Sequence, residues 1–93
     1  MIRMELCKKI KIINDLGLHA RAAARIVGLG KQYKSQLFLK KGDREADGSS
    51  ILSILTLSCP KGTEVEARIV GEDSEAFMER LSQLLEQRFE ESR

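Results

Sequence analysis

The sequence predicts an α+β domain in which helices cover one face of an antiparallel sheet. Three observations lead to this class: alternating apolar residues indicate strands, apolar residues at helical spacing indicate helices, and clusters of turn residues separate the two. In chain order the segments read βαββαβα, which is typical of an antiparallel sheet with its helices on one side. Because the chain has 93 residues and 42% hydrophobic content, we expect one domain over residues 1–93.

The first half of the chain is expected to form a strand, a helix and a hairpin. Leu6, Ile10 and Ile12 share one face of a half-buried strand, and turn residues at 14–17 separate this strand from the helix. The second strand of the hairpin is polar, which suits a sheet edge. The predicted segments are a strand over 5–13, a helix over 20–31, and hairpin strands over 36–40 and 44–47.

The second half is expected to form a short helix, a strand and a longer helix. Pro60 and Gly62 stop the short helix, and Val65, Ala67 and Ile69 alternate in the clearest strand of the chain. The last helix begins with acidic residues, which its dipole favours. The predicted segments are a helix over 51–57, a strand over 64–70, and a helix after 71–74 with an apolar stripe of Phe77, Met78, Leu81, Leu84, Leu85 and Phe89.

Charge is unevenly distributed although the net charge is only +2. Residues 1–44 hold eleven Lys or Arg and three Asp or Glu, whereas residues 45–93 hold five and eleven, so the halves carry +8 and −6. Such a split steers an anionic partner toward one surface. The chain lacks the interleaved aromatic residues of single-stranded nucleic-acid binders, so we expect no nucleic-acid partner.

Targeting and metal-binding signals are weak. The charged N-terminal run contains no apolar stretch of the length that a signal peptide or membrane span needs, so we expect a cytoplasmic protein without membrane insertion. Cys7 and Cys59 are far apart, and with His19 they do not make up a four-ligand zinc site. We therefore expect reduced thiols, no metal and no cofactor.

His19, the single histidine of the chain, lies directly before the first predicted helix. A helix start has backbone N–H groups without internal partners and a partial positive charge of roughly +0.5, so it suits an anion. Arg21 lies in the first turn and Arg25 one turn later, with no acidic residue nearby in the sequence. A neutral imidazole there could accept a phosphoryl group that Arg21 and the helix amides then hold. The alternative is a histidine that merely caps the helix, and spacing alone does not exclude it.

Residues 14–21, Asn-Asp-Leu-Gly-Leu-His-Ala-Arg, closely resemble the active-site motif of the HPr family, the histidine-containing phosphocarriers of the bacterial phosphoenolpyruvate-dependent phosphotransferase system. Residues 48–57, Gly-Ser-Ser-Ile-Leu-Ser-Ile-Leu-Thr-Leu, resemble the second signature of the family, and residues 61–63 also fit. The resemblance covers essentially the whole chain. One departure is Ala22, where the family usually has proline; alanine restores an N–H to the first turn and leaves transfer rate and partner preference open.

The resemblance implies an open-faced β-sandwich with three helices over a four-stranded antiparallel sheet. It also implies that phosphorylated enzyme I passes a phosphoryl group to Nδ1 of His19, and that the protein delivers this group to an enzyme IIA domain for sugar transport. Such a phosphocarrier is a substrate of enzyme I rather than a stand-alone enzyme. We expect a monomer that docks its partners briefly through a modest interface.

Ser50 corresponds to the regulatory serine of the family, which an HPr kinase/phosphorylase phosphorylates in many bacteria. A phosphoserine at a helix start is electrostatically tolerated, so its effect is expected on partners rather than on the fold. Ser49 and Ser50 as simple helix caps remain the alternative.

The short second helix supplies a candidate docking surface. Its spacing puts Ile54 and Leu57 on one side and three apolar residues on nearly the opposite side, and the family docks its partners through its first two helices. Burial of all five residues is the alternative. The predicted partner-binding residues are Ala20, Arg25, Ile51, Leu52 and Leu55.

Two other functions remain open at this point. A carrier of the nitrogen-related regulatory branch would use the same His19 chemistry to set the state of a sensor domain. A pure interaction domain would act through Ser50 and the second helix, with His19 idle.

Overall fold

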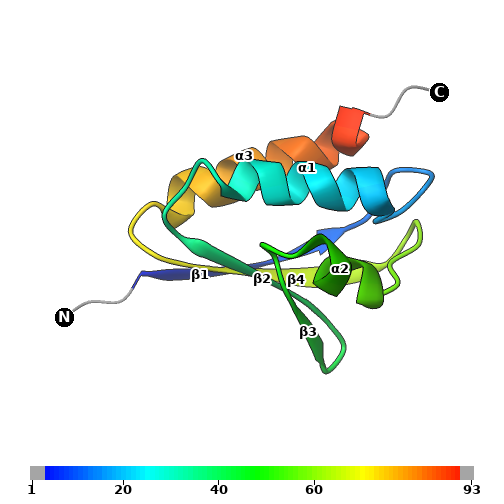
Figure 1. Cartoon of the computed structure of the whole chain (residues 1–93), viewed down its shortest axis with the longest axis horizontal. Helices are drawn as coiled ribbons and strands as arrows, with labels where there is room; N and C mark the ends of the chain where they lie inside the picture. Colours follow the sequence, from blue (N-terminus) through cyan, green and yellow to red (C-terminus); the bar gives the residue numbers. More distant parts are fainter. Residues whose placement is uncertain (1–3, 91–93) are drawn as a thin grey trace.

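A four-stranded antiparallel sheet forms one layer of the molecule and helices form the other, as the computed structural model in Figure 1 shows. The structure describes residues 4–90. The elements in chain order are β1 (Glu5–Lys11), α1 (Ala20–Gly30), β2 (Gln36–Lys41), β3 (Arg44–Asp47), α2 (Ile51–Thr56), β4 (Glu64–Val70), α3 (Ser74–Glu86) and the 3-10 turn η1 (Arg88–Glu90). This order confirms the predicted βαββαβα fold.

The strands lie in the order β1-β4-β2-β3, so β4 and β2 are central and β1 and β3 form the edges. Ala67 of β4 pairs with Lys8 of β1 on one side and with Leu39 of β2 on the other, and all three pairings of strands are antiparallel. The predicted bounds of β3 and β4 match the structure, whereas β1 ends at Lys11, two residues before its predicted end. Strand alternation thus located the central strand β4 correctly.

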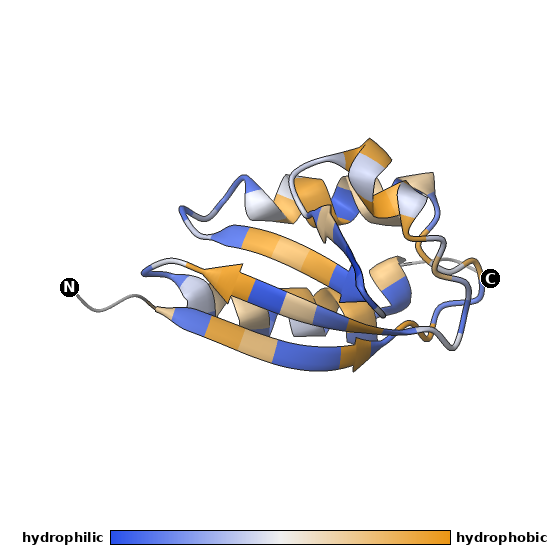
Figure 2. Cartoon of the chain, turned by 90° about the horizontal axis from the view of Figure 1, so that it is seen from below, coloured by the Kyte–Doolittle hydropathy of each residue, from blue (hydrophilic) through white to orange (hydrophobic). Residues whose placement is uncertain are grey.

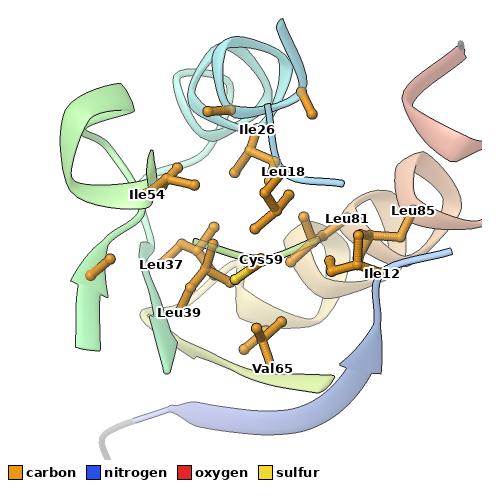
Figure 3. Packing of buried hydrophobic residues seen from close by; sticks show 14 of the residues in the cluster. Ile12, Leu18, Ile26, Leu37, Leu39, Ile54, Cys59, Val65, Leu81 and Leu85 are labelled. Carbon is orange, nitrogen blue, oxygen red and sulfur yellow. The ribbon is translucent and has the colours of Figure 1, made fainter. Parts of the chain in front are cut away.

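The core lies between the sheet and the three helices. In β4, Val65, Ala67 and Ile69 are buried and the residues between them are not, which Figure 2 shows as alternating colours along the strands. In Figure 3, Ile54 of α2, Ile26 of α1 and Leu81 of α3 point toward the strand residues Leu37, Leu39 and Val65. Burial of this apolar surface is the main favourable term in folding.

The end of the last helix corrects the sequence analysis. The apolar stripe was expected to continue along the helix to Phe89, but α3 ends at Glu86. Arg88 and Phe89 adopt left-handed backbone angles, with φ of 55° and 56°, and Phe89 is nevertheless 1% exposed. A tight turn therefore brings the Phe89 ring into the core. Leu84, another residue of the predicted apolar stripe, is only partly buried.

Between residues 4 and 90, no helix has the length and apolar character needed to cross a lipid bilayer.

Candidate functional site

The loop that precedes α1 rests on a segment more than forty residues away in the sequence. The Leu18 N–H donates to the Cys59 carbonyl oxygen at 2.8 Å. Gly17 has a φ of +68°, and a Cβ atom there would lie 2.4 Å from that same carbonyl oxygen and 2.8 Å from Cα of Pro60. Only glycine combines this backbone angle with this close approach. The segment around Cys59 therefore sets the position of the residues that lead into α1.

Two side chains reinforce this loop. Asn14 is buried, and its Nδ2 donates to the Gly17 carbonyl oxygen at 2.7 Å, which closes the turn. Lys61 forms an ion pair with Asp15 at 2.9 Å, which adds a second link to the segment after Cys59. Burial raises the pKa of the Cys59 thiol, so this group stays protonated at neutral pH and serves in packing.

His19 is the N-cap residue of α1. Its backbone is extended, with φ −79° and ψ 179°, and its Nδ1 accepts a hydrogen bond from the Arg21 backbone N–H at 3.2 Å. A ring nitrogen that accepts carries no proton, so the proton of the neutral ring lies on Nε2. The side chain is half-buried rather than enclosed in the core. Nδ1 is therefore the nitrogen that faces the positive end of the helix.

The first turn of α1 is basic and carries no acidic residue. Arg21 is exposed, and among residues 4–90 no carboxylate lies within ion-pair distance of its guanidinium. Ala20 is exposed beside it, whereas Ala22 and Ala23 are fully buried. The helix forms without proline at position 22, as expected from the high helix propensity of alanine.

Ser50 is the N-cap residue of α2, and its Oγ accepts from the Ser53 backbone N–H at 3.2 Å. The neighbouring Ser49 is held differently, because both its N–H and its hydroxyl donate to Oδ1 of Asp47, at 2.9 and 2.7 Å. These two hydrogen bonds, the backbone one first, lower the pKa of Asp47 below its usual value. At the other end of α2, Lys41 Nζ donates to the carbonyl oxygens of Leu57 and Ser58.

The apolar residues of α2 divide between core and surface. Ile54 and Leu57 are 0% and 2% exposed, whereas Ile51 and Leu52 are 38% and 76% exposed, which confirms the predicted division for these four residues. Leu55 was expected on the surface, but it is half-buried and contacts the core, because its position lies between the two faces of the helix.

The sequence analysis missed Leu16, which is 67% exposed in the loop before His19. The available signal was an apolar residue inside the polar turn at 14–17. Arg25, in contrast, does not lie on the α2 side of α1: it is half-buried and lines a groove between α1 and α3. The protein therefore has two different surfaces here. One is apolar and contains Leu16, Ile51 and Leu52, and the other is the groove beside α3 that Arg25 lines.

The chain is similar to known phosphocarrier proteins over most of its length. The family model described as "PTS HPr component phosphorylation site" matches residues 6–87. The phosphocarrier protein HPr of Xylella fastidiosa strain Temecula1 is 39% identical over 83 residues, which cover 89% of this chain and 93% of that protein. The phosphocarrier protein NPr of Shewanella violacea is 28% identical over 95% of this chain and 97% of its own length.

A solved structure supports the same assignment. The crystal structure of HPr-C-His from Thermoanaerobacter tengcongensis superposes with a TM-score of 0.89 at 32% identity and covers 95% of this chain and 99% of that one. The match of the family model spans both signature segments, the one around His19 and the one around Ser50. The chain belongs to the HPr family of phosphocarrier proteins of the phosphotransferase system.

Proposed function

We propose that this protein accepts a phosphoryl group from phosphorylated enzyme I on Nδ1 of His19 and passes it to an enzyme IIA domain of the sugar phosphotransferase system. The observation that carries the proposal is the hydrogen bond from the Arg21 backbone N–H to Nδ1, at 3.2 Å. In this hydrogen bond Nδ1 is the acceptor, with its lone pair directed at the start of α1. A nitrogen in this state has the lone pair needed to attack phosphorus.

In the transfer, the Nδ1 lone pair forms the N–P bond while the bond between phosphorus and its carrier atom on enzyme I breaks, and that electron pair stays with the carrier atom. Nδ1 then no longer accepts from the Arg21 N–H, so this donor becomes available to a phosphoryl oxygen. The Arg21 guanidinium and the positive end of α1 stabilise the added negative charge. Delivery to enzyme IIA reverses these steps, and the proton on Nε2 stays in place throughout.

This role makes the protein a substrate of enzyme I and not a stand-alone catalyst. Nothing in the transfer requires a metal or another cofactor, because the charge on the phosphoryl group is met by protein donors. We propose that the protein acts in the cytoplasm as a monomer, with Leu16, Ala20, Ile51 and Leu52 in the docking surface. Leu16, Ile51 and Leu52 are exposed apolar side chains, which are typical of docking surfaces.

We propose Ser50 as the site of regulatory phosphorylation by an HPr kinase/phosphorylase. Its Oγ acts as an acceptor toward Ser53, so its hydroxyl proton is directed elsewhere, whereas the Ser49 hydroxyl already donates to Asp47. A phosphate on Ser50 would add negative charge next to the exposed Ile51 and Leu52. Its main effect would therefore fall on partner docking rather than on the fold.

A second candidate is a carrier of the nitrogen-related branch, which the 28% identity to an NPr protein supports. The two roles share the chemistry at His19 and differ in the acceptor. Transfer from the phosphorylated protein to purified sugar-specific and nitrogen-specific enzyme IIA domains separates them. Faster transfer to the sugar-specific domain is expected, and a preference for the nitrogen-specific domain would assign the protein to the regulatory branch.

The central experiment is incubation of the protein with enzyme I and radiolabelled phosphoenolpyruvate. We expect acid-labile label on the wild-type protein and none on His19→Ala, with Ser50→Ala as the control that keeps the label. Absence of label on wild-type protein with an active cognate enzyme I would contradict the carrier role and favour a pure interaction domain.

Replacement of Arg21 sharpens the assignment. Arg21→Ala should slow phosphoryl exchange by about tenfold, the loss expected for one charge-assisted hydrogen bond of about 1.4 kcal/mol. The melting temperature should change little, because a cation at a helix start does not stabilise the empty helix. A large drop in melting temperature would instead indicate a structural role for Arg21.

A further inference from the structure

A groove between α1 and α3 lies outside the transfer chemistry at His19. It has a volume of about 660 Å³, and its polar lining consists of Arg25 and Gln32 from one side and Arg80, Gln83 and Gln87 from the other. Two arginines and three glutamines therefore line the groove, and no Asp or Glu of the described residues 4–89 lines it. This composition favours a ligand with several negatively charged or carbonyl oxygens.

The distribution of charge on the two helices makes the groove distinct from its surroundings. Helix α1 contains no acidic residue. In α3, Glu86 lines a different hollow, the one toward β1 that also contains Lys8. Arg80 makes no ion pair with any residue of the described range 4–90. Helix α3 therefore contributes one cation, Arg80, and none of its three glutamates to the groove, and Glu86 lies toward β1.

The groove also continues the His19 site along α1. Arg21 and Arg25 are four residues apart and so share a face of the helix, and Gln32, in the turn after α1, lines the same groove as Arg25. In Figure 1, α1 begins near the end of α3 and the two helices run in opposite directions. The end of the groove that contains Arg25 and Gln87 is therefore the end nearest to the start of α1.

We propose that this groove binds an acidic peptide segment of the protein partner that docks at His19. Arginine side chains pair with carboxylates in bidentate geometry, and the glutamine amides match the main-chain groups of an extended peptide. The volume is in the range that holds a ligand of several residues. Among the residues that the structure describes, no aromatic side chain lines the groove, which argues against a nucleic-acid strand. The identification of the partner as a phosphoryl donor or acceptor rests on the proposed function, whereas the acidic chemistry does not.

The binding test uses the full chain labelled with ¹⁵N and a twelve-residue peptide of alternating aspartate and serine. We expect chemical-shift changes at the amides of Gly28, Gln32, Gln83 and Gln87 that weaken as salt is added. The matched peptide with asparagine in place of aspartate should give none. Shift changes confined to other surfaces, or equal binding of a twelve-nucleotide single-stranded DNA, would overturn the proposal.

Two variants of equal charge change make this test specific. Arg80→Glu should weaken peptide binding by about tenfold, since it removes one cationic contact and adds a repulsive charge. Arg44→Glu changes an exposed residue of β3 and should leave the affinity unchanged. Equal losses for the two variants would show that the peptide senses only the overall charge, which would overturn the proposal.

The kinetic test separates this inference from the carrier role. Arg80→Glu should raise KM severalfold for phosphorylated enzyme I or for an enzyme IIA domain and leave kcat and the label on His19 intact. An unchanged KM for both partners would overturn the assignment of the groove to a docked partner. If wild-type protein takes up no label, the carrier role fails while the peptide titration still decides what the groove binds.

Discussion

The helix starts at α1 and α2 both have a preceding glycine and a side-chain cap, and they differ in the backbone angle of that glycine and in their chemical surroundings. Each has a glycine two residues before the cap, Gly17 before His19 and Gly48 before Ser50, and each cap accepts a hydrogen bond from the first turn. At α1 the cap is a ring nitrogen beside an exposed arginine. At α2 the cap is the hydroxyl of Ser50. The residue before it, Ser49, donates to the carboxylate of Asp47, so a negative charge lies near this helix start. The shared geometry positions a modifiable atom, and the neighbouring charges decide what happens to it.

The difference also concerns rigidity. A Cβ at Gly17 would meet backbone atoms of Cys59 and Pro60, which do not move independently of the chain. A Cβ at Gly48 would meet Cγ of Leu37 at 2.6 Å and its carbonyl oxygen at 2.7 Å, and the backbone of Gly48 is not left-handed. The start of α1 is thus held against rigid backbone, whereas part of the support for α2 is a side chain that has other rotamers. A group that accepts and releases a phosphoryl group must be held in a fixed position, and the backbone support at the start of α1 meets this need better than the support at α2.

Replacing Gly17 by alanine should give the largest effect. The left-handed backbone costs roughly 1–2 kcal/mol with a side chain, and the overlap with Cys59 and Pro60 adds about 1–3 kcal/mol. Thermal unfolding should show a loss of stability of about 2–5 kcal/mol together with slower labelling of His19. Gly48→Ala should lose less, since it adds only the overlap.

Gly42→Ala is the control for this comparison, because Gly42 has a φ of +61° and no atom within 4 Å of a Cβ at that position. The Gly42→Ala variant should lose about 1 kcal/mol of unfolding free energy, because only backbone strain is added. A Gly17→Ala variant as stable as Gly42→Ala would show that the contact with Cys59 does not support the loop.

The caps themselves should separate stability from transfer. Ser50→Ala should lose about 1 kcal/mol of unfolding free energy, and Ser50→Asp should keep it, because aspartate is an equally good N-cap residue. Both should still accept label on His19, but Ser50→Asp should exchange it more slowly with enzyme I because of its charge next to Leu52. Equal exchange rates for the two variants would count against the proposed regulation at Ser50.

Ala22 offers a smaller change at the start of α1. The first hydrogen bond inside the helix runs from the Ala23 N–H to the His19 carbonyl oxygen, so the Ala22 N–H belongs to the leading amides of α1. Ala22→Pro removes this donor and should shorten the lifetime of the phosphohistidine about fivefold, the equivalent of about 1 kcal/mol. Hydrolysis of isolated, labelled protein measures this. A longer lifetime in the variant would exclude the Ala22 N–H as a donor to the phosphate.

The smallest effect is expected in the acid stability of the turn before α2. The hydrogen bonds from Ser49 lower the pKa of Asp47, so their contribution is present above the ordinary aspartate pKa and is lost as the pH falls through the lowered value. Ser49→Ala removes the hydroxyl bond and keeps the backbone one, so it should lower the melting temperature slightly at pH 7 and leave it unchanged at pH 2. The loss of melting temperature between pH 5 and pH 2 should therefore be slightly smaller in this variant.

Asp73 supplies an internal reference for that measurement. Its pKa is also lowered, first by the hydroxyl of Ser35 and then by the backbone N–H of Lys34, and these bonds remain in the Ser49→Ala variant. A residual acid dependence should therefore persist. If the Ser49→Ala profile matches wild type at pH 7 and at pH 2, the Ser49 hydroxyl does not contribute to acid stability through Asp47.

Much of this architecture follows from local patterns. The alternation of Val65, Ala67 and Ile69 predicts the central strand within its observed bounds, and the spacing of Ile54 and Leu57 predicts the buried face of α2. Periodicity reports which residues share a face, because backbone geometry sets the spacing of side chains. It does not report what lies opposite that face. Local spacing therefore did not predict that Arg25 faces α3 or that Phe89 reaches the core through a left-handed turn.

The sequence by itself determined the order of the elements, their buried faces and the place of His19 at the start of a helix, since each depends on residues close together in the chain. Only the tertiary structure decided how that histidine is held. The contact of Gly17 with Cys59 and the ion pair of Asp15 with Lys61 join segments separated by more than forty residues. The groove between α1 and α3 likewise exists only because two distant helices pack side by side. Contacts of this kind depend on how complete elements fit together, which no local spacing of residues specifies.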